Sequence, residues 1–406
     1  MKKLNEGSYA GILKAFSERV AEMPHTYYPG EKVHKTQTFE RLFSTLKPIF
    51  PAVTPLGSKG DRPLQMDFES ELNALIFFHL EEHASARHLI LTLKTDDFAR
   101  RRIAPEKGIG KSSFSEAINS RGLPQMQEVF QHLLGCAAGL LPDAHPELGE
   151  LVAIDGSLIE ATLSMVWADY RKCSKKAKLH LGFNLNQGIP QSLILTPGKS
   201  AEYIYVEKLL KTKQTGVMDR YYQCHAAFDY WQDQERFFAC RIKANTTKTV
   251  IEEKPIPTDG PVFYDAIVKL GTPTSQTKHQ LRLIGYQIGS HTFWIATNRF
   301  DLSAQQIVLV YKLRWDIECF FAWWKRHMRV YHLIARSPYG LMMQILAGLI
   351  TYLLLTIYCH KLFGKSVNIE RLRKIRIQIQ NELRSTFTEP NPHEFSEWTY
   401  SVQAIT

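Results

Sequence analysis

Four polar side chains between residues 311 and 325 have the types and the spacing to act together on a phosphate group. They are Tyr311, Arg314, Glu318 and Lys325. At about 100° per residue, a helix would place all four within an arc of roughly 60°. A guanidinium and an ammonium bind phosphate oxygens, and a carboxylate can hold a metal ion that acts on a phosphodiester. The stretch therefore predicts a helix face at a nucleic-acid site.

The same stretch has an apolar side that would hold this face in place. Over roughly the next 100° of the helix lie six apolar or aromatic residues, Val310, Leu313, Ile317, Phe320, Phe321 and Trp324. A stripe of this width predicts that the helix packs against a core. A solvated amphipathic helix without a site would give the same pattern, so the spacing alone leaves both interpretations open.

Two aspartates upstream stand where strands are expected to end. Residues 151–155 read Leu-Val-Ala-Ile-Asp, an apolar run that predicts a buried strand ending at Asp155. Residues 216–219 read Gly-Val-Met-Asp, a shorter run that ends at Asp219. Asp229 competes for this second position, but it falls inside a helix expected over residues 226–234. Placement at a strand end favours Asp219.

The spacing of the four polar residues, with two, three and six residues between them, resembles the YREK signature of the IS-four family of bacterial insertion-sequence transposases of the DDE type. The resemblance covers residues 150–335. It departs from the family at Tyr221, which stands where the family usually has the glycine of Asp-Arg-Gly-Tyr.

The resemblance implies a catalytic triad of Asp155, Asp219 and Glu318. Such a triad would hold two divalent ions, most naturally Mg²⁺, which suits oxygen ligands and which Mn²⁺ could replace. The ions would activate a nucleophile on one side of a phosphodiester and stabilise the leaving oxygen on the other. By the same resemblance, Tyr311, Arg314 and Lys325 would bind the phosphates of the transposon end.

Further DNA contacts are expected from basic residues elsewhere. Arg241 and Lys243 lie on or just after the strand expected to follow Asp219. Lys111 belongs to a basic region, residues 94–122, in which we expect a helix from Phe114 to Ser120, capped by Ser112 or Ser113, that could enter a DNA groove. An ordinary solvated helix is the alternative.

Composition agrees with a DNA partner and an intracellular enzyme. The chain has 406 residues with 50 Lys plus Arg against 40 Asp plus Glu, a net charge of +10 that favours a polyanion. The first residues lack an apolar signal core. The six cysteines form no CxxC pair, which argues against a zinc knuckle or a disulfide framework. We expect a bacterial cytoplasmic protein associated with the nucleoid.

The expected fold is α/β, an RNase H-like catalytic core interrupted by a β-rich insertion, with helical N-terminal and C-terminal regions. We predict a helical DNA-binding region over residues 1–149, the catalytic domain over 150–335 with its insertion at about 245–290, and a helical region over 336–406. Leu341 to Cys359 form an apolar run of 19 residues, almost long enough to cross a membrane. We expect a core helix there and no membrane association.

These observations favour a DDE transposase that binds the terminal inverted repeats of its element and a target DNA, acting as a homodimer in the synaptic complex. One alternative is a DNA-binding protein derived from such an enzyme that no longer cuts. Another is a zinc peptidase, because His79 and His83 fit an H-x-x-E-H pattern. A third zinc ligand is not recognisable from the sequence.

Overall fold

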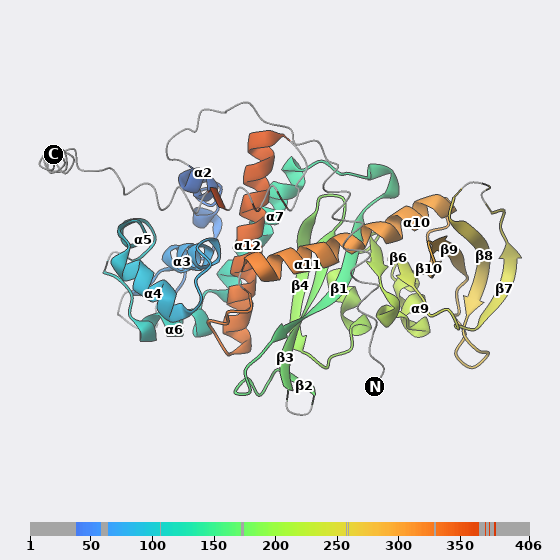
Figure 1. Ribbon diagram of the computed structural model, residues 1–406, viewed down its shortest axis with the longest axis horizontal. Helices are drawn as coiled ribbons and strands as arrows, with labels where there is room; N and C mark the ends of the chain where they lie inside the picture. Colours follow the sequence, from blue (N-terminus) through green and yellow to red (C-terminus); the bar gives the residue numbers. More distant parts are fainter. Residues whose placement is uncertain are drawn as a thin grey trace, which may run out of the picture. The chain divides into compact units, whose positions relative to one another are not determined.

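The computed structural model describes residues 38–57, 64–105, 107–171, 174–256, 258, 260–328 and 330–364, together with residues 370, 373, 377 and 378. Its centre is a mixed sheet of ten strands (Figure 1). The strands are β1 (Leu151–Glu160), β2 (Asp169–Arg171), β3 (Ser174–Asn184), β4 (Ile189–Pro197), β5 (Thr215–Met218), β6 (Phe237–Arg241), β7 (Lys248–Glu253), β8 (Val262–Leu270), β9 (Leu281–Ile288) and β10 (His291–Thr297).

The strand order is β2-β3-β1-β5-β6-β10-β9-β8-β7, with β4 also paired to β3. The three central strands β1, β5 and β6 are parallel, whereas β3 and β4 continue from β1 as antiparallel neighbours. On the other side, β10, β9, β8 and β7 extend the sheet through antiparallel pairs. The expected α/β class is therefore confirmed, and the β-rich texture of residues 245–290 corresponds to β7, β8 and β9.

Some of the described helices lie against this sheet, whereas α2 to α6 lie to one side of it beyond α12 (Figure 1). The α-helices are α2 (Thr38–Ser44), α3 (Phe68–Leu80), α4 (Ala86–Thr95), α5 (Asp97–Arg102), α6 (Lys111–Ser120), α7 (Leu123–Leu140), α8 (Val206–Leu209), α9 (His225–Asp233), α10 (Ala304–Leu313), α11 (Trp315–His327) and α12 (Pro338–Phe363). Four 3₁₀ turns complete the described elements: η1 (Phe50–Ala52), η2 (Pro146–Leu148), η3 (Tyr203–Tyr205) and η4 (Arg220–Tyr222).

Helix α12 joins the helical N-terminal part to the sheet. It packs against α3, α6 and α7 on the one hand and against β4 on the other (Figure 1). Its length and hydropathy would suffice to cross a membrane, but 94% of its most apolar window is buried inside the protein. Packing within the protein therefore accounts for the apolar character of residues 341–359.

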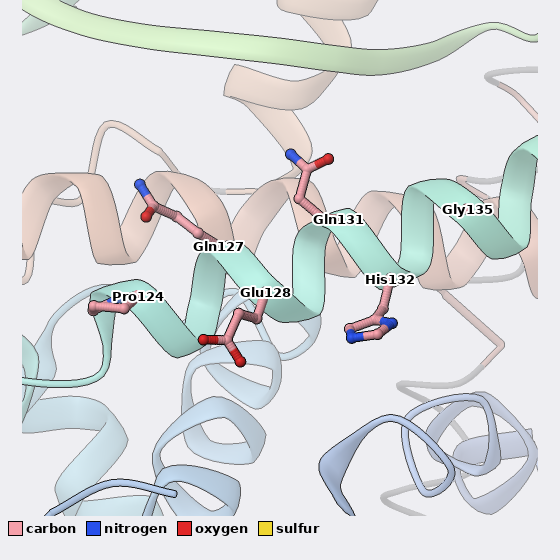
Figure 2. Close-up of a pocket in the computed structure, with 6 residues that line it drawn as sticks. All are labelled: Pro124, Gln127, Glu128, Gln131, His132 and Gly135. Carbon is pink, nitrogen blue, oxygen red and sulfur yellow. The ribbon is translucent and has the colours of Figure 1, made fainter. Parts of the chain in front are cut away.

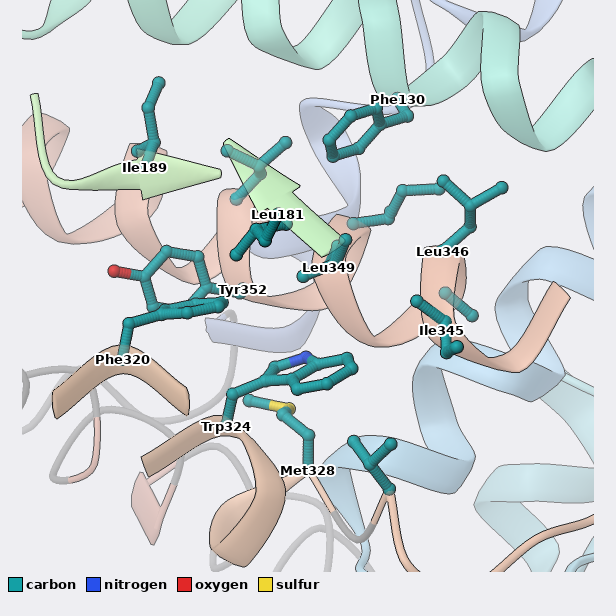
Figure 3. Close-up of a cluster of buried hydrophobic side chains, with 14 of the residues drawn as sticks. Phe130, Leu181, Ile189, Phe320, Trp324, Met328, Ile345, Leu346, Leu349 and Tyr352 are labelled. Carbon is teal, nitrogen blue, oxygen red and sulfur yellow. The ribbon is translucent and has the colours of Figure 1, made fainter. Parts of the chain in front are cut away.

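The two faces of the sheet carry separate apolar cores. On one face, Phe320 and Trp324 of α11 pack against α12, β3 and β4 (Figure 3). The ring of Phe320 lies 4.9 Å from that of Tyr352 and 5.0 Å from that of Phe183. The other face is covered by α8 and α9, with Tyr222 in its core. The expected apolar anchor of the 311–325 stretch is thus confirmed.

The helix expected over residues 311–325 is divided. This stretch is two helices, because α10 ends at Leu313 and α11 begins at Trp315, with Arg314 at the junction. Elsewhere, α3 ends at Leu80, and Ser85 caps α4 by accepting from the backbone N–H of His88. Between residues 202 and 210 lie the 3₁₀ turn η3 and the short helix α8.

The expected serine cap of the 114–120 helix is wrong. Helix α6 already begins at Lys111, and its N-cap is Gly110, which makes no side-chain capping bond. The hydroxyl of Ser113 donates instead to the side-chain oxygen of Gln65. This tertiary contact cannot be read from the local sequence, and it removes one of the two predicted caps from that role.

Candidate active site

The register between β1 and β5 brings two acidic residues to one edge of the sheet. These parallel strands pair from Leu151 with Thr215 to Ala153 with Val217. Continued by two residues, the same register sets Asp155 level with Asp219, the residue that follows the last residue of β5. The expected strand end at Asp155 is wrong, because β1 continues to Glu160 and pairs Asp155 with Leu181 of β3. Asp229, the competing candidate, is buried in α9 and accepts two backbone N–H groups, which gives it a structural role.

Arg314 lies among three carboxylates. Its Nη2 donates to Oε1 of Glu318 at 2.6 Å, and its guanidinium lies 5.5 Å from the ring centre of Tyr311. Its positive charge also lowers the pKa values of Asp155 and Asp219, which places both carboxyl groups within its electrostatic reach. Arg314 stands at the junction between α10 and α11. It bonds Glu318 and interacts electrostatically with Asp155 and Asp219.

Burial disfavours the ionised forms of Asp155 and Asp219. Desolvation raises the pKa of Asp155 to about 7, opposed by the backbone N–H of Gly156, which donates to Oδ1 at 2.8 Å. Desolvation also raises the pKa of Asp219, whose Oδ1 accepts from the backbone N–H of Tyr221 at 2.9 Å. A cation beside them would favour their ionised forms.

Lys325 approaches Asp155 from α11. Its Nζ donates to the backbone oxygen of Leu158 at 2.7 Å, and burial lowers its pKa to about 8, although Asp155 raises it. Lys325 also lines a cavity together with Ala322, Arg326, Tyr331 and His332. At neutral pH its ammonium remains mostly charged and is positioned to meet an anion that enters beside Asp155.

The three other predicted DNA-binding residues lie in different parts of the structure. The guanidinium of Arg241, at the end of β6, lies 4.6 Å from the ring centre of Phe293 and lowers the pKa of Asp219, so it belongs to the site. Lys243 is exposed beyond β6, and its backbone N–H donates to the side chain of Gln223. Lys111 is exposed at the start of α6, a helix that packs on α12.

Sequence reasoning missed a second group of residues at this edge. Glu202, which precedes η3, forms an ion pair of 3.0 Å with Lys178 of β3. Tyr222, in η4, is fully buried, and burial followed by the charges of Glu202 and the two aspartates raises the pKa of its phenol. Glu202 belongs to no recognisable motif, and its closeness to Asp155 arises only from the folding of β3 and β4 beside β1. The Gly156 that follows Asp155 was the only local signal.

The carboxylate groups of the site are of the chemical type that binds divalent metal ions. Carboxylate oxygens are the ligands that Mg²⁺ and Mn²⁺ prefer, and the burial of Asp155 and Asp219 leaves them in need of a counter-charge. Among the described residues, no three His, Cys, Asp or Glu side chains are arranged closely enough to enclose such an ion. Glu318 faces Arg314 instead. Metal binding would therefore require Glu318 to turn from Arg314 toward the aspartates.

Two other candidate sites carry no such chemistry. Both ring nitrogens of His79 contact backbone oxygens, of Met328 at 2.6 Å and of Gln344 at 3.1 Å, which leaves no lone pair for zinc. A cavity along α7 is lined by Pro124, Gln127, Glu128, Gln131, His132 and Gly135 (Figure 2). There the carboxylate of Glu128 already accepts from the backbone and hydroxyl of Thr54.

Comparison with known proteins identifies the family. A relative from Geobacillus stearothermophilus, named as the probable transposase of insertion sequence element IS5377, is 27% identical over 194 residues, 47% of this chain and 51% of the relative. A protein of Synechocystis named for transposition of element IS4SA is 22% identical over 276 residues, 65% of this chain and 76% of the relative. The chain thus spans about half the length of the first of these.

Among solved structures, the chain is similar to the piggyBac transposase synaptic complex with hairpin DNA, at 9% identity and a TM-score of 0.43, covering 91% of this chain and 85% of that one. A sequence model described as the transposase DDE domain matches residues 146–354, just over half of the chain. This match contains both sheet-edge aspartates and the whole of α11. The chain therefore belongs to the family of DDE-domain transposases.

Proposed function

We propose that this protein is the transposase of a bacterial insertion sequence, and that it binds the ends of its element and catalyses metal-dependent DNA cleavage and strand transfer. The observation that carries the proposal is the approach of Asp155, Asp219 and Glu318 to the single guanidinium of Arg314. In this proposal the three carboxylates are the catalytic residues and the metal ligands. Two Mg²⁺ ions, replaceable by Mn²⁺, would be held there.

When bound, the ions supply Lewis-acid stabilisation of the charge that develops on the attacking and leaving oxygens. The chain supplies the rest. Arg314, released from Glu318, is free to bind a phosphate through two N–H groups, and Lys325 presents a point charge beside Leu158. The buried phenol of Tyr311, next to Arg314, limits the directions in which the guanidinium can move.

The finer assignments follow from the same resemblance. We assign the chain to the IS-four family with Tyr311, Arg314, Glu318 and Lys325 as its YREK residues. The strands β3, β4, β1, β5 and β6 would form an RNase H-like catalytic domain within residues 150–335, with β7, β8 and β9 as its insertion. Of the helical regions expected over 1–149 and 336–406, residues 1–37 and nearly all residues after 364 lie outside the described part of the chain. A homodimer on double-stranded DNA, in the cytoplasm at the nucleoid, would be the active species.

A cleavage assay tests the proposal. The substrate is duplex DNA carrying the short inverted repeats that bound the gene for this chain, incubated with Mg²⁺ or Mn²⁺. We expect nicking at the repeat ends by the wild type, and its loss in Asp155→Asn, Asp219→Asn and Glu318→Gln, while DNA binding in a gel-shift assay remains. Glu207→Gln, an exposed carboxylate on α8, is the matched control and should cut normally.

The same assay separates the alternative, a DNA-binding protein derived from a transposase that no longer cuts. Such a protein would bind the repeats yet show no nicking with either metal ion, in the wild type as in the variants. Continued nicking by Glu318→Gln would show instead that α11 does not supply the third carboxylate. The proposal as stated would then be wrong.

A further inference from the structure

A fourth carboxylate approaches the catalytic edge from the opposite face of the sheet. In β1 successive side chains alternate between faces, so Asp155 points toward α11 whereas position 156 faces the other way. A Cβ atom at Gly156 would lie 2.9 Å from Oε1 of Glu202. Only glycine lets the carboxylate of Glu202 rest against the β1 backbone at this point. Glu202 is thereby held beside the residue that follows Asp155.

At this position β1 has no strand partner on its β5 side. The pairing of β1 with β5 ends at Ala153, and β5 itself ends at Met218. Beyond these residues no strand of the described chain lies between β1 and β6, while β1 itself continues to Glu160 beside β3. In agreement, the negative charge of Glu202 helps to raise the pKa of Asp155. Glu202 and Asp155 are thus electrostatic neighbours across the sheet edge.

Lys178 holds Glu202 in its present position. Its Nζ donates to Oε1 of Glu202 and to the backbone oxygen of Ser200, both at 3.0 Å. The side chains of Lys178 and Glu202 are 12% and 19% exposed, so the pair is largely shielded from water. This arrangement parallels the one on the other face, where Arg314 holds Glu318. Glu202 and Glu318 are thus each paired with a basic side chain of their own.

Tyr222 provides an independent sign that something is to be bound among these carboxylates. The residue is 0% exposed, and its hydroxyl has no hydrogen-bond partner in the structure. Burial raises the pKa of this phenol most, and the charges of Glu202, Asp155 and Asp219 raise it further. A buried hydroxyl without a partner is unfavourable, so it is expected to donate to a group that enters with a ligand. Water accompanying a divalent cation would be such a group.

We propose that Glu202 is a fourth carboxylate of the divalent-cation site, reaching the ions from the face of the sheet opposite Glu318, and that Lys178 holds it away until a cation binds. This inference rests on the proposed function, because it requires a metal site at Asp155 and Asp219. It adds a ligand that the three-carboxylate assignment lacks. It also assigns a use to the unbonded hydroxyl of Tyr222, which lies next to where that ligand would act.

Mn²⁺ binding to the full-length protein without DNA tests the inference, read from the loss of the free-ion signal in electron paramagnetic resonance. Asp155→Asn serves as the reference variant. Glu202→Gln should weaken Mn²⁺ binding about 10-fold or more, within the range of effects seen when groups around a metal site are removed. Lys178→Met should leave binding unchanged or strengthen it, because it frees Glu202. Glu207→Gln is the matched control, an exposed glutamate on the neighbouring α8.

The opposite responses of Glu202→Gln and Lys178→Met distinguish a ligand from a structural ion pair. If the pair only stabilises the fold, both variants should lower the unfolding midpoint and neither should change Mn²⁺ affinity relative to wild type. That result, with weakened binding in Asp155→Asn, would overturn the role of Glu202 alone. If Asp155→Asn also binds Mn²⁺ normally, the proposed function itself fails at this site.

Circular dichroism of each variant establishes that it is folded before binding is measured. Should Glu202→Gln not fold, Glu202→Asp keeps the charge that pairs with Lys178 but shortens the reach toward the ions. It should then weaken Mn²⁺ binding while Lys178→Met does not. Equal affinities for wild type and Glu202→Asp would overturn the inference in that case.

Discussion

Arg314 and Glu318 form an ion pair of 2.6 Å across the first turn of α11. The carboxylate expected to complete the catalytic triad is therefore neutralised by the side chain expected to bind phosphate. Neither residue can take up its proposed role while this contact persists. Entry of a divalent cation and of a DNA phosphate would each draw one partner away, so the two ligands should favour one another's binding.

The first prediction concerns Arg314. Replacing it by Gln removes the positive charge that the three carboxylates share, and also a phosphate contact. We expect single-turnover cleavage to fall about 100-fold or more, the scale typical of losing a donor that stabilises developing charge. Binding to the repeat ends should fall much less. Lys312→Gln, exposed two residues earlier near the end of α10, should retain near wild-type cleavage, and equal losses in both variants would contradict a specific role for Arg314.

The second prediction concerns pH and metal binding. The pKa of Asp155 is raised to about 7, so the carboxyl group is partly protonated at neutral pH and must lose its proton to bind a cation. Metal affinity should therefore rise between about pH 6 and pH 8, with proton release near neutral pH. Isothermal titration calorimetry in two buffers of different ionisation enthalpy measures this release. Asp155→Asn should abolish the Asp155 contribution to it.

The third prediction concerns the stability contributed by Glu71 in α3. Burial raises its pKa from 4.5 to about 8, so the folded state holds a proton that the unfolded state releases at lower pH. Its contribution to stability is fully present below about pH 4.5 and is lost as the pH rises through 8. Glu71→Gln cannot titrate. Its unfolding free energy relative to wild type should rise by about 1 kcal/mol per pH unit across this interval, measured by urea denaturation.

A pH-independent difference between Glu71→Gln and wild type would show that Glu71 is ionised in the folded protein. Glu69→Gln offers a control on the same helix, because residue 69 is exposed and its carboxylate remains in water. Its stability relative to wild type should not vary with pH over the same interval.

The fourth prediction concerns the strands beyond β10. Asp265 of β8 and Arg282 of β9 form a buried two-point ion pair, with distances of 2.9 and 2.7 Å, and are 3% and 8% exposed. Arg282 also donates to the backbone oxygen of Leu302, just before α10. Asp265→Ala should lower the unfolding free energy by about 3–5 kcal/mol, because it leaves a buried guanidinium without its carboxylate.

Urea denaturation measures this effect, and Asp169→Asn is its control, since Asp169 pairs with lysines at the protein surface. The control should leave the unfolding midpoint unchanged. A small effect of Asp265→Ala would mean that β8 and β9 are held by their backbone pairing and apolar side chains alone.

The residues that could be predicted were those whose position depends on local pattern. Asp219 directly follows the apolar strand β5, as expected, and the apolar stripe of α11 follows from its helical spacing. Asp155 instead lies inside β1, because residues 156–160 continue to pair with β3 after the apolar run has ended. No proline or glycine stands next to Arg314, so the sequence does not predict the junction between α10 and α11. Tertiary packing sets it there, where α10 meets the β6 side of the sheet and α11 meets β1.

Glu202 could not be predicted for a different reason. Its contacts join β3 to the turn after β4, and its approach to Asp155 depends on the absent side chain of Gly156. Glu202 lies far along the chain from both Lys178 and Gly156, so no helical or strand spacing links it to them. The DNA contact predicted for Lys111 stays a prediction, since a basic local sequence does not fix which surface a helix presents or where that helix is placed.

The position of α12 has a consequence for biosynthesis. Helices α3, α6 and α7 leave the ribosome long before the segment that covers their apolar sides, because α12 lies near the end of the described chain. Until α12 has been synthesised, the nascent polypeptide would expose the apolar surface of these helices and would depend on chaperones. A truncated translation product that stops before Pro338 would be aggregation-prone, which ties enzyme yield to complete synthesis.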